Sequence, residues 1–197
     1  GIPRQVWLHA RRDGDDHRFA DRARNAEDVC RSDARERGQD RVARRRLAAI
    51  MFADMVGYSR QIEQDERLNS LQAAKSVELF KSLIGDYGGE VANVAGDGIL
   101  ALFNSAEQAV RFAVQVQSEF RDQAVWSNGR PIQFRIGINI GDVIIDEGDV
   151  YGDGVNIAAR LEALAPPGGI CISGTAFDTA GGKLALDFED IGFQAFK

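Results

Sequence analysis

Residues 47–59 have the sequence LAAIMFADMVGYS, an apolar run that ends in a carboxylate and a turn. A continuous apolar run of this length predicts a buried strand at the centre of a sheet. Asp54 ends the strand, and Gly57 lets the chain turn sharply just after it. Such a turn exposes successive backbone N–H groups, which favour anionic oxygens. The stretch therefore predicts a central strand with an anion-binding turn at its end.

A second carboxylate occupies a similar place further along the chain. Residues 91–103, VANVAGDGILALF, are two apolar runs around Gly-Asp-Gly, which predicts a β-hairpin with Asp97 at its tip. If this hairpin neighbours the central strand, Asp54 and Asp97 lie close together. Two carboxylates and phosphate oxygens suit two Mg²⁺ or Mn²⁺ ions. Each aspartate alone is explained equally well as a turn former.

A third motif favours the metal interpretation. In residues 149–160, DVYGDGVNIAAR, Asn156 and Arg160 are four apart, so they share a face of a helix. Asn supplies a neutral hydrogen bond and Arg a charged fork, which together suit sugar and phosphate oxygens. The alternative is an amphipathic helix with a capping Asn and a solvated Arg. That alternative is weaker here, because apolar residues surround both side chains.

The periodicity of the remaining sequence predicts the order of elements. Strands are expected at residues 47–53, 91–95, 99–103, 170–172 and 184–191, and at 132–140 and 143–146 as a pair around Gly141-Asp142. Helices are expected at residues 64–87, at 105–120 after a Ser105/Gln108 capping box, and at 153–164 and 174–180. This order predicts an α+β fold: a ferredoxin-like βαββαβ core with additional C-terminal α/β elements, as one sheet with helices packed on one face.

The first 46 residues differ in composition from the rest of the chain. They contain 13 Arg, no Lys and 9 acidic residues, a balance of +4, whereas residues 47–197 have a balance of −10. Because aliphatic residues are scarce there, residues 1–46 are predicted to be a separate, weakly ordered segment, and residues 47–197 one folded domain. The acidic body argues against nucleic acid as a partner, because a phosphate backbone requires a basic surface.

Cysteine usage and hydropathy narrow the class of protein further. Cys30 and Cys171 form no metal-binding or disulfide pattern. No apolar run approaches the roughly 20 residues of a membrane span, and no signal-peptide pattern is present. We therefore expect a cytoplasmic protein with reduced thiols and no membrane segment in this chain.

Four motifs taken together resemble the catalytic domain of class III adenylate and guanylate cyclases. They are ADMVGYS at residues 53–59, GDG at 96–98, RIGINIG at 135–141 and VNIAAR at 155–160. The resemblance covers residues 47–197 and leaves out the first 46. It implies a nucleotidyl cyclase that converts ATP to 3′,5′-cyclic AMP and pyrophosphate, by attack of the ribose 3′-oxygen on the α-phosphorus. It also implies a head-to-tail homodimer with the site at its interface, so that a monomer is inactive.

The resemblance assigns roles to the residues of these motifs. Asp54 and Asp97 match the two aspartates that hold Mg²⁺ or Mn²⁺, and the carbonyl of Met55 matches a backbone metal ligand. Asn156 and Arg160 match the catalytic pair that orients the ribose and stabilises the transition state. The turn that holds the triphosphate is matched by Val56, Gly57, Tyr58 and Ser59.

The residues that would read the base match the family less completely. Asp149 fits an adenine-binding position, because a carboxylate accepts a hydrogen bond from the exocyclic amine. Asn93 stands where adenylate cyclases of the family commonly have Lys and guanylate cyclases Glu. Its amide can donate to an adenine ring nitrogen, although with shorter reach and no charge. ATP is favoured over GTP as the substrate on this basis.

Two other functions share part of the pattern. A catalytically silent cyclase-like domain, which binds nucleotide or only dimerises, would explain the departure at Asn93. It would also explain a missing last strand: the family continues past the stretch that matches residues 191–196 into a closing strand, without which a sheet edge is unpaired. Lys197 is the nearest match to a phosphate-binding Lys of that end, although a terminal residue is usually solvated. A polymerase-like or diguanylate-forming palm would also use two carboxylates, but residues 88–90 lack its acidic-Phe signature and the Asn/Arg helix has no role in it.

Overall fold

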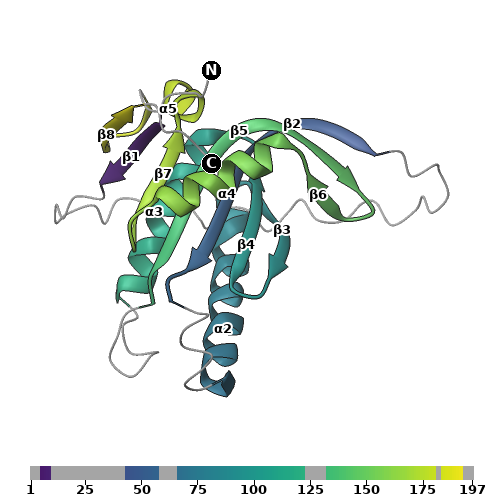
Figure 1. Cartoon of the computed structure of the whole chain (residues 1–197), viewed down its shortest axis with the longest axis vertical. Coiled ribbons are helices and arrows are strands. Elements are labelled where there is room, and N and C mark those ends of the chain that lie inside the picture. Colours follow the sequence, from purple (N-terminus) through teal and green to yellow (C-terminus); the bar gives the residue numbers. More distant parts are fainter. Residues whose placement is uncertain (1–4, 10–42, 58–65, 123–131, 181–182, 193–197) are drawn as a thin grey trace.

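The computed structural model describes residues 5–9, 43–57, 66–122, 132–180 and 183–192. The strands are β1 (Gln5–His9), β2 (Arg44–Met55), β3 (Gly89–Ala95), β4 (Gly98–Phe103), β5 (Phe134–Asp146), β6 (Asp149–Tyr151), β7 (Ile170–Ser173) and β8 (Asp187–Gly192). The helices are α2 (Glu66–Ile84), followed by a 3-10 turn (η1, Gly85–Tyr87), α3 (Ala106–Asp122), α4 (Asp153–Leu164) and α5 (Gly174–Ala180). The strands form one sheet in the order β3-β4-β2-β5-β7-β1-β8, with β6 paired to β5 (Figure 1).

Strand β2 lies at the centre of the sheet, between β4 and β5, as its apolar sequence predicts. Successive residues of a strand point to opposite faces. Met51 and Ala53 enter the main core with Phe80 of α2 and Phe112 of α3. Ile50 enters a second core together with Ala158 of α4. Both faces of β2 are thus buried, which explains why its sequence shows no alternation of polar residues.

The predicted α+β class with a single sheet is confirmed, but the prediction that the helices pack on one face does not hold for α4. Helices α2, α3 and α5 cover one face of the sheet, whereas α4 crosses the opposite face (Figure 1). The predicted hairpin is formed by β3 and β4, with Gly96 at φ +64° in the turn before Asp97. The N-cap half of the predicted capping box is present, because the Ser105 hydroxyl accepts a hydrogen bond from the Gln108 backbone N–H at 3.2 Å.

The predicted pair of strands around Gly141-Asp142 is wrong. Strand β5 runs without interruption from Phe134 to Asp146 and pairs with β2 as far as Arg44↔Ile145. The chain turns instead at Glu147 (φ +49°) and Gly148 (φ +92°), and returns as β6. Gly141 serves helix packing: a Cβ there would lie 3.1 Å from the Cα of Gly154 in α4. Gly141 therefore marks a close approach between a helix and a strand, and not a turn.

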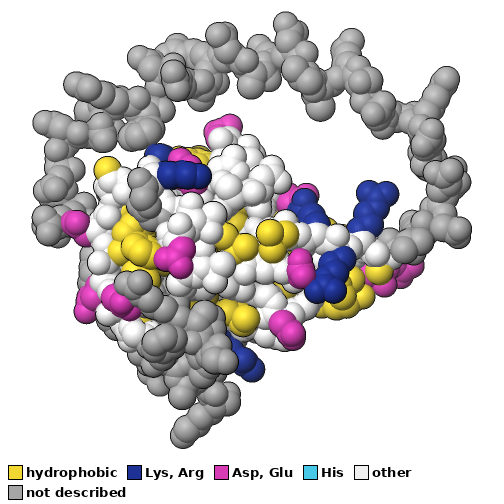
Figure 2. Space-filling model, turned by 90° about the horizontal axis from the view of Figure 1, so that it is seen from above, with side chains coloured by type: hydrophobic (Ala, Val, Ile, Leu, Met, Phe, Trp, Pro, Cys, Tyr) yellow, Lys and Arg dark blue, Asp and Glu magenta, His cyan; other side chains and the backbone are white. Residues whose placement is uncertain are grey.

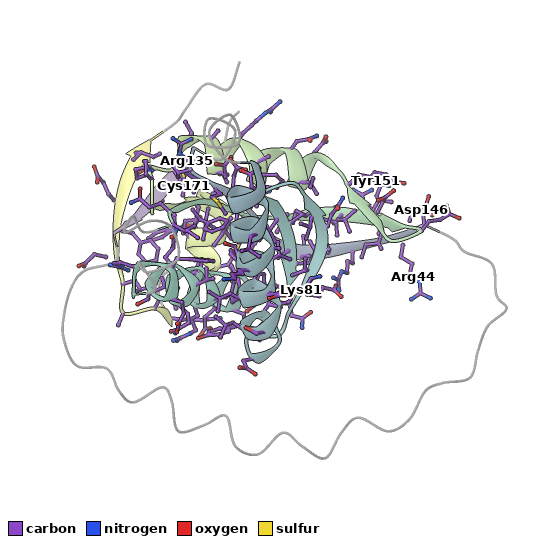
Figure 3. The ribbon with its side chains drawn as sticks, turned by 90° about the horizontal axis from the view of Figure 1, so that it is seen from below. Arg44, Lys81, Arg135, Asp146, Tyr151 and Cys171 are labelled. Atoms are coloured by element: carbon purple, nitrogen blue, oxygen red, sulfur yellow. The ribbon has the colours of Figure 1, made fainter. Side chains whose placement is uncertain are left out.

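The ends of β2, β5 and β6 extend from the body as an arm (Figure 1). Figure 3 labels Arg44, Asp146 and Tyr151 on this arm, and Figure 2 shows basic side chains at its end. Leu47 and Tyr151 are apolar residues of the arm that remain 69% and 46% exposed. The arm therefore presents both basic and apolar side chains to solvent.

Residues 5–9 differ from the expectation of weak order for residues 1–46. Gln5–His9 form β1, which lies inside the sheet between β7 and β8. Arg44–Arg46 also belong to β2, because they pair with β5 beyond the apolar run. Residues 1–4 and 10–42, and with them Cys30, lie outside the described residues, as do Tyr58, Ser59 and Lys197.

Candidate active site

The structure brings Asp54 and Asp97 together. Asp54 is the penultimate residue of β2, and Asp97 lies in the turn between β3 and β4. Strands β2 and β4 are neighbours, with Ala53 paired to Ile99, so both side chains lie at the same end of the sheet. The two carboxyl groups share a hydrogen bond, and the Met55 backbone N–H contributes another to Asp54. The two predicted metal ligands thus form one acidic pair within a single chain.

This acidic pair holds a proton more tightly than isolated carboxyls do. Burial raises the pKa of Asp54 to about 6, and the charge of Asp97 adds to the increase. Burial also raises the pKa of Asp97. Two carboxyl groups this close resist simultaneous ionisation unless a cation lies between them. Divalent metals prefer such oxygen ligands, so the donor set fits Mg²⁺ or Mn²⁺.

Arg135 is a site residue that the sequence reasoning missed. It lies on β5 directly opposite Asp54 in the strand register, and its charge lowers the pKa of that carboxyl. Its Nε is buried and has no hydrogen-bond partner among the described residues. An unpartnered guanidinium N–H beside a cation site suits a phosphate oxygen. The available signal was its position at the start of the RIGINIG motif, one of the four motifs that indicate the family.

Glu162 was also missed. It lies near the end of α4, is 8% exposed, and has its pKa raised to about 7 by burial and by the charge of Asp54. The backbone of Glu162 packs closely on β5: a Cβ on Gly137 would lie 2.3 Å from the Glu162 nitrogen. Nothing local in the sequence distinguishes this glutamate from a solvated one on the outer face of a helix.

Asn156 and Arg160 lie on the exposed side of α4, away from the residues by which that helix packs on the sheet. The buried residues of α4 are Gly154, Ala158, Leu161 and Glu162. The cation that shifts the pKa of Asp54 is Arg135, and Arg160 is not among the charges that do so. Within one chain, the predicted site residues therefore form two groups, the acidic pair and the exposed Asn/Arg pair.

Comparison with known proteins shows the family to which the chain belongs. Residues 42–192 match the family model of the adenylate and guanylate cyclase catalytic domain. The chain belongs to this class III cyclase family. This cyclase domain is 43% identical over 159 residues to putative adenylate cyclase 3 of Rhizobium meliloti (strain 1021), a match that covers 78% of the chain and 27% of that protein.

Two further matches are to proteins that are also named as cyclases. The domain is 30% identical over 145 residues to an adenylate cyclase of Streptomyces coelicolor, covering 71% of the chain and 35% of that protein. A crystal structure from Silicibacter pomeroyi, titled adenylate/guanylate cyclase/hydrolase, is 40% identical with a TM-score of 0.70, and the match covers 78% of this chain and 91% of that one. The cyclase domain thus spans about a quarter to a third of the length of the curated relatives it matches.

The turn after β2 is partly described. The Val56 N–H donates to the Gln133 carbonyl at 2.9 Å, so it already has a partner. Gly57 is exposed and has φ +79°, a conformation that favours glycine. The predicted contacts of Tyr58 and Ser59 lie outside the described residues. Of the described part of this turn, the Gly57 N–H is the better candidate to hold an anion.

The two residues expected to read the base are both exposed. Asn93 lies on β3 beside a register shift in its pairing with β4, and Asp149 begins β6. Strands β3 and β6 contact one another, so the two residues lie on adjacent elements.

Two further observations concern the described residues alone. They contain no group of three or more His, Cys, Asp or Glu side chains that could hold a metal ion. A metal at the Asp54/Asp97 pair would therefore need backbone or substrate oxygens as well. Among the same residues, the cyclase domain has no helix both long and apolar enough to cross a membrane.

Proposed function

We propose that this cyclase domain is an adenylate cyclase that converts ATP to 3′,5′-cyclic AMP and pyrophosphate in a head-to-tail homodimer. The observation that carries the proposal is the hydrogen-bonded pair of Asp54 and Asp97, with Arg135 opposite Asp54. Three charged groups converge there at the end of the central strand, where a triphosphate and its metal ions need them.

The carboxylates of Asp54 and Asp97 and the carbonyl of Met55 would hold two Mg²⁺ or Mn²⁺ ions. Such ions offset negative charge at a phosphoryl group and make a nearby hydroxyl more acidic. The raised pKa of both carboxyls supports this proposal. Without a metal ion, a shared proton reduces the repulsion between the two carboxylates, and a bound cation would reduce it in the same way.

The triphosphate would lie between the turn at Gly57 and the side chain of Arg135. The Gly57 N–H, followed by those of Tyr58 and Ser59, would bind phosphate oxygens, whereas the Val56 N–H is engaged by Gln133. The buried Nε of Arg135, which has no hydrogen-bond partner among the described residues, would gain one. Burial makes this hydrogen bond valuable, because an unsatisfied buried donor is costly.

The second chain would complete the site with Asn156 and Arg160. Both side chains are exposed, so they are accessible to another copy. Asn156 would orient the ribose, and Arg160 would stabilise charge as the bond between the 3′-oxygen and the α-phosphorus forms. The bond from the α-phosphorus to the bridging oxygen breaks in the same step, pyrophosphate leaves, and the 3′-hydroxyl proton is lost to solvent. Exposed Leu47 and Tyr151 on the arm are in keeping with a partner chain.

ATP is the proposed substrate because Asp149 can accept a hydrogen bond from the adenine amine, whereas guanine presents a carbonyl at that position. Asn93 would donate to a ring nitrogen of the same base. The two curated relatives named above are both adenylate cyclases by name.

The test is to incubate the purified chain with Mn²⁺ and either ATP or GTP, and to quantify cyclic products by mass spectrometry. Asp54→Ala and Arg160→Ala should each lower turnover by roughly 100-fold or more, because each removes a group of the transition-state site. Mixing the two inactive variants should restore activity, since one of the two sites in a mixed dimer is intact. Exposed Asp178→Ala and Arg121→Ala are matched controls that should stay active.

No cyclic product from a dimeric sample with either nucleotide would contradict the proposal. ATP binding without turnover would favour the catalytically silent alternative. A failure of complementation under conditions that exchange subunits would contradict the shared site, even if the wild type is active.

A further inference from the structure

Asn139 is a buried polar residue in the middle of β5, where it is only 4% exposed. Its neighbours Ile138 and Ile140 pack in or against the main core, so Asn139 points to the opposite face of the sheet, on which α4 lies. There its side-chain amide donates a hydrogen bond to the Gly154 carbonyl at 3.2 Å. A buried side-chain hydrogen bond thus connects the centre of the sheet to the first turn of α4.

The residues that flank Asn139 on this face of β5 are glycines. A Cβ on Gly137 would lie 2.1 Å from the Ala158 carbonyl oxygen, and one on Gly141 would lie 3.1 Å from the Gly154 Cα. These contacts set how closely α4 approaches β5, but van der Waals contacts have little directional preference. A hydrogen bond is directional. Asn139 is therefore the member of this row that can fix where α4 lies along the strand.

The start of α4 has no side-chain cap of its own. Its N-cap residue is Gly152, and no side-chain hydrogen bond caps the helix there. The backbone N–H groups of Val155 and Asn156 donate to the Gly152 carbonyl at 3.0 and 3.4 Å. The side-chain hydrogen bond from Asn139 to this turn therefore comes from another element, the strand beneath it.

The first turn of α4 leads directly to the Asn/Arg pair. Asn156 lies two residues after Gly154, and Arg160 follows about one helical turn later on the same side. Both are exposed, on the outer side of the helix. Because α4 is a short, continuous helix, a shift of its first turn along β5 would displace both side chains together.

We propose that Asn139 is a positioning residue that fixes α4 along β5, and so places Asn156 and Arg160 for the site that they complete on a partner chain. The inference rests on the proposed homodimeric cyclase, and it adds to it a residue that touches neither substrate nor metal. A displacement of about 1 Å in a group that acts on the substrate can lower turnover by roughly 100-fold. Loss of this hydrogen bond should therefore lower turnover by more than its modest effect on stability would explain.

The first experiment requires no catalysis. Asn139→Leu keeps a branched side chain but removes the donor. Hydrogen exchange, followed by mass spectrometry, should become faster in peptides from residues 153–164 than in peptides from β4 of the same protein. Gln117→Leu is the matched control, because Gln117 of α3 is 6% exposed and its amide also donates to a backbone carbonyl, that of Phe134 at 2.8 Å. It should leave exchange in residues 153–164 unchanged.

The second experiment separates positioning from a general loss of stability. In the mixed dimer of Asp54→Ala and Arg160→Ala chains, the complete site takes its Asn156 and Arg160 from the Asp54→Ala chain. Asn139→Leu on that chain should lower kcat by roughly 10-fold or more. The KM for ATP should rise by less than about 3-fold, because the displaced groups act mainly in the transition state. The same substitution on the Arg160→Ala chain should have little effect.

The control should not reproduce this dependence on the chain. Gln117 binds the carbonyl of Phe134, the residue before Arg135, so any effect of Gln117→Leu on the site should come from the Arg160→Ala chain. Asn139→Asp is a second variant that keeps the size of the side chain and replaces the donor with an acceptor. It should show the same dependence on the chain as Asn139→Leu, and it serves if the leucine variant does not fold.

Two outcomes would overturn the proposal. Exchange in residues 153–164 could stay at the wild-type rate, which would show that Asn139 does not hold α4. Asn139 variants could lower kcat equally from either chain, which would make the residue a purely structural one. A mixture of Asp54→Ala and Arg160→Ala chains that restores no activity would contradict the proposed function instead, and the exchange measurement would still decide whether Asn139 holds the helix.

Discussion

Replacement of Gly137 by alanine should displace helix α4. A Cβ at this position would lie 2.1 Å from the carbonyl oxygen of Ala158 and 2.3 Å from the nitrogen of Glu162. Ordinary contacts begin at 3.4 Å, so the helix and β5 must separate by about 1 Å. Both neighbours are backbone atoms, so no side-chain rotation can relieve the clash. We expect a loss of about 3 kcal/mol in the free energy of unfolding, at the upper end of the range for overpacking.

The measurement is urea denaturation followed by circular dichroism, with Gly85→Ala as the matched control. A Cβ on Gly85 would meet no atom within 4 Å, so the same substitution there should change the free energy of unfolding by less than about 1 kcal/mol. If Gly137→Ala unfolds at the wild-type urea concentration, α4 does not pack on β5 as closely as the structure shows, and the reasoning is refuted.

Three other changes test local features of the domain. Burial raises the pKa of Glu162 from 4.5 to about 7, so the folded protein binds more protons than the unfolded one in this window. The free energy of unfolding that this group contributes is complete below pH 4.5 and is lost as the pH rises through about 7. Glu162→Gln should therefore reduce the loss of stability between about pH 5 and about pH 7.5, measured by urea denaturation at both pH values. Ser105→Ala should cost about 1 kcal/mol by loss of the helix cap, measured by thermal melting, whereas Ser82→Ala at an exposed helical hydroxyl should cost less. Gln117→Leu should cost about 1 kcal/mol in the same assay, because the carbonyls of Phe134 and Gly169 that its amide bridges each keep a second donor.

Most elements from β2 to β8 can be predicted from the sequence because they show their period locally, whereas β5 was divided in two and β6 was not predicted. The pairing of Asp54 with Asp97 can be predicted as well, since both follow apolar strands that a hairpin brings side by side. The misinterpretation of Gly141 shows a limit: glycine marks turns and close helix approaches alike, and only the packing of α4 distinguishes them.

Long-range contacts account for what the sequence did not reveal. Strand β1 is five residues in an Arg-rich segment, and its partners β7 and β8 lie at the other end of the chain. No local hydrophobic pattern in the sequence predicts such a long-range pairing. Arg135 and Glu162 belong to the candidate site because β5 and α4 meet beside Asp54, a contact that depends on Gly137. A charged residue on a strand or helix looks the same in sequence whether it faces a carboxylate or water.

Helix α4 relates the two halves of the proposed site. Its inner side places Glu162 in the electrostatic environment of Asp54 and Asp97 of the same chain. Its outer side presents Asn156 and Arg160 to solvent. In the proposed homodimer, each α4 would therefore take part in two sites, one through its inner side and one through its outer side.

This double role makes a prediction for the mixed dimer of Asp54→Ala and Arg160→Ala chains, which has one complete site. Gly137→Ala on the Asp54→Ala chain displaces the helix that supplies Arg160 to that site, so it should lower the restored activity strongly. The same change on the Arg160→Ala chain shifts Glu162 and the part of β5 beside Arg135 but leaves in place the helix that supplies Arg160, so its effect should be smaller. Cyclic product is measured well below the unfolding temperature, with Gly85→Ala on each chain as the control. A larger effect from the Arg160→Ala chain would contradict the assignment of Arg160 to the partner's site.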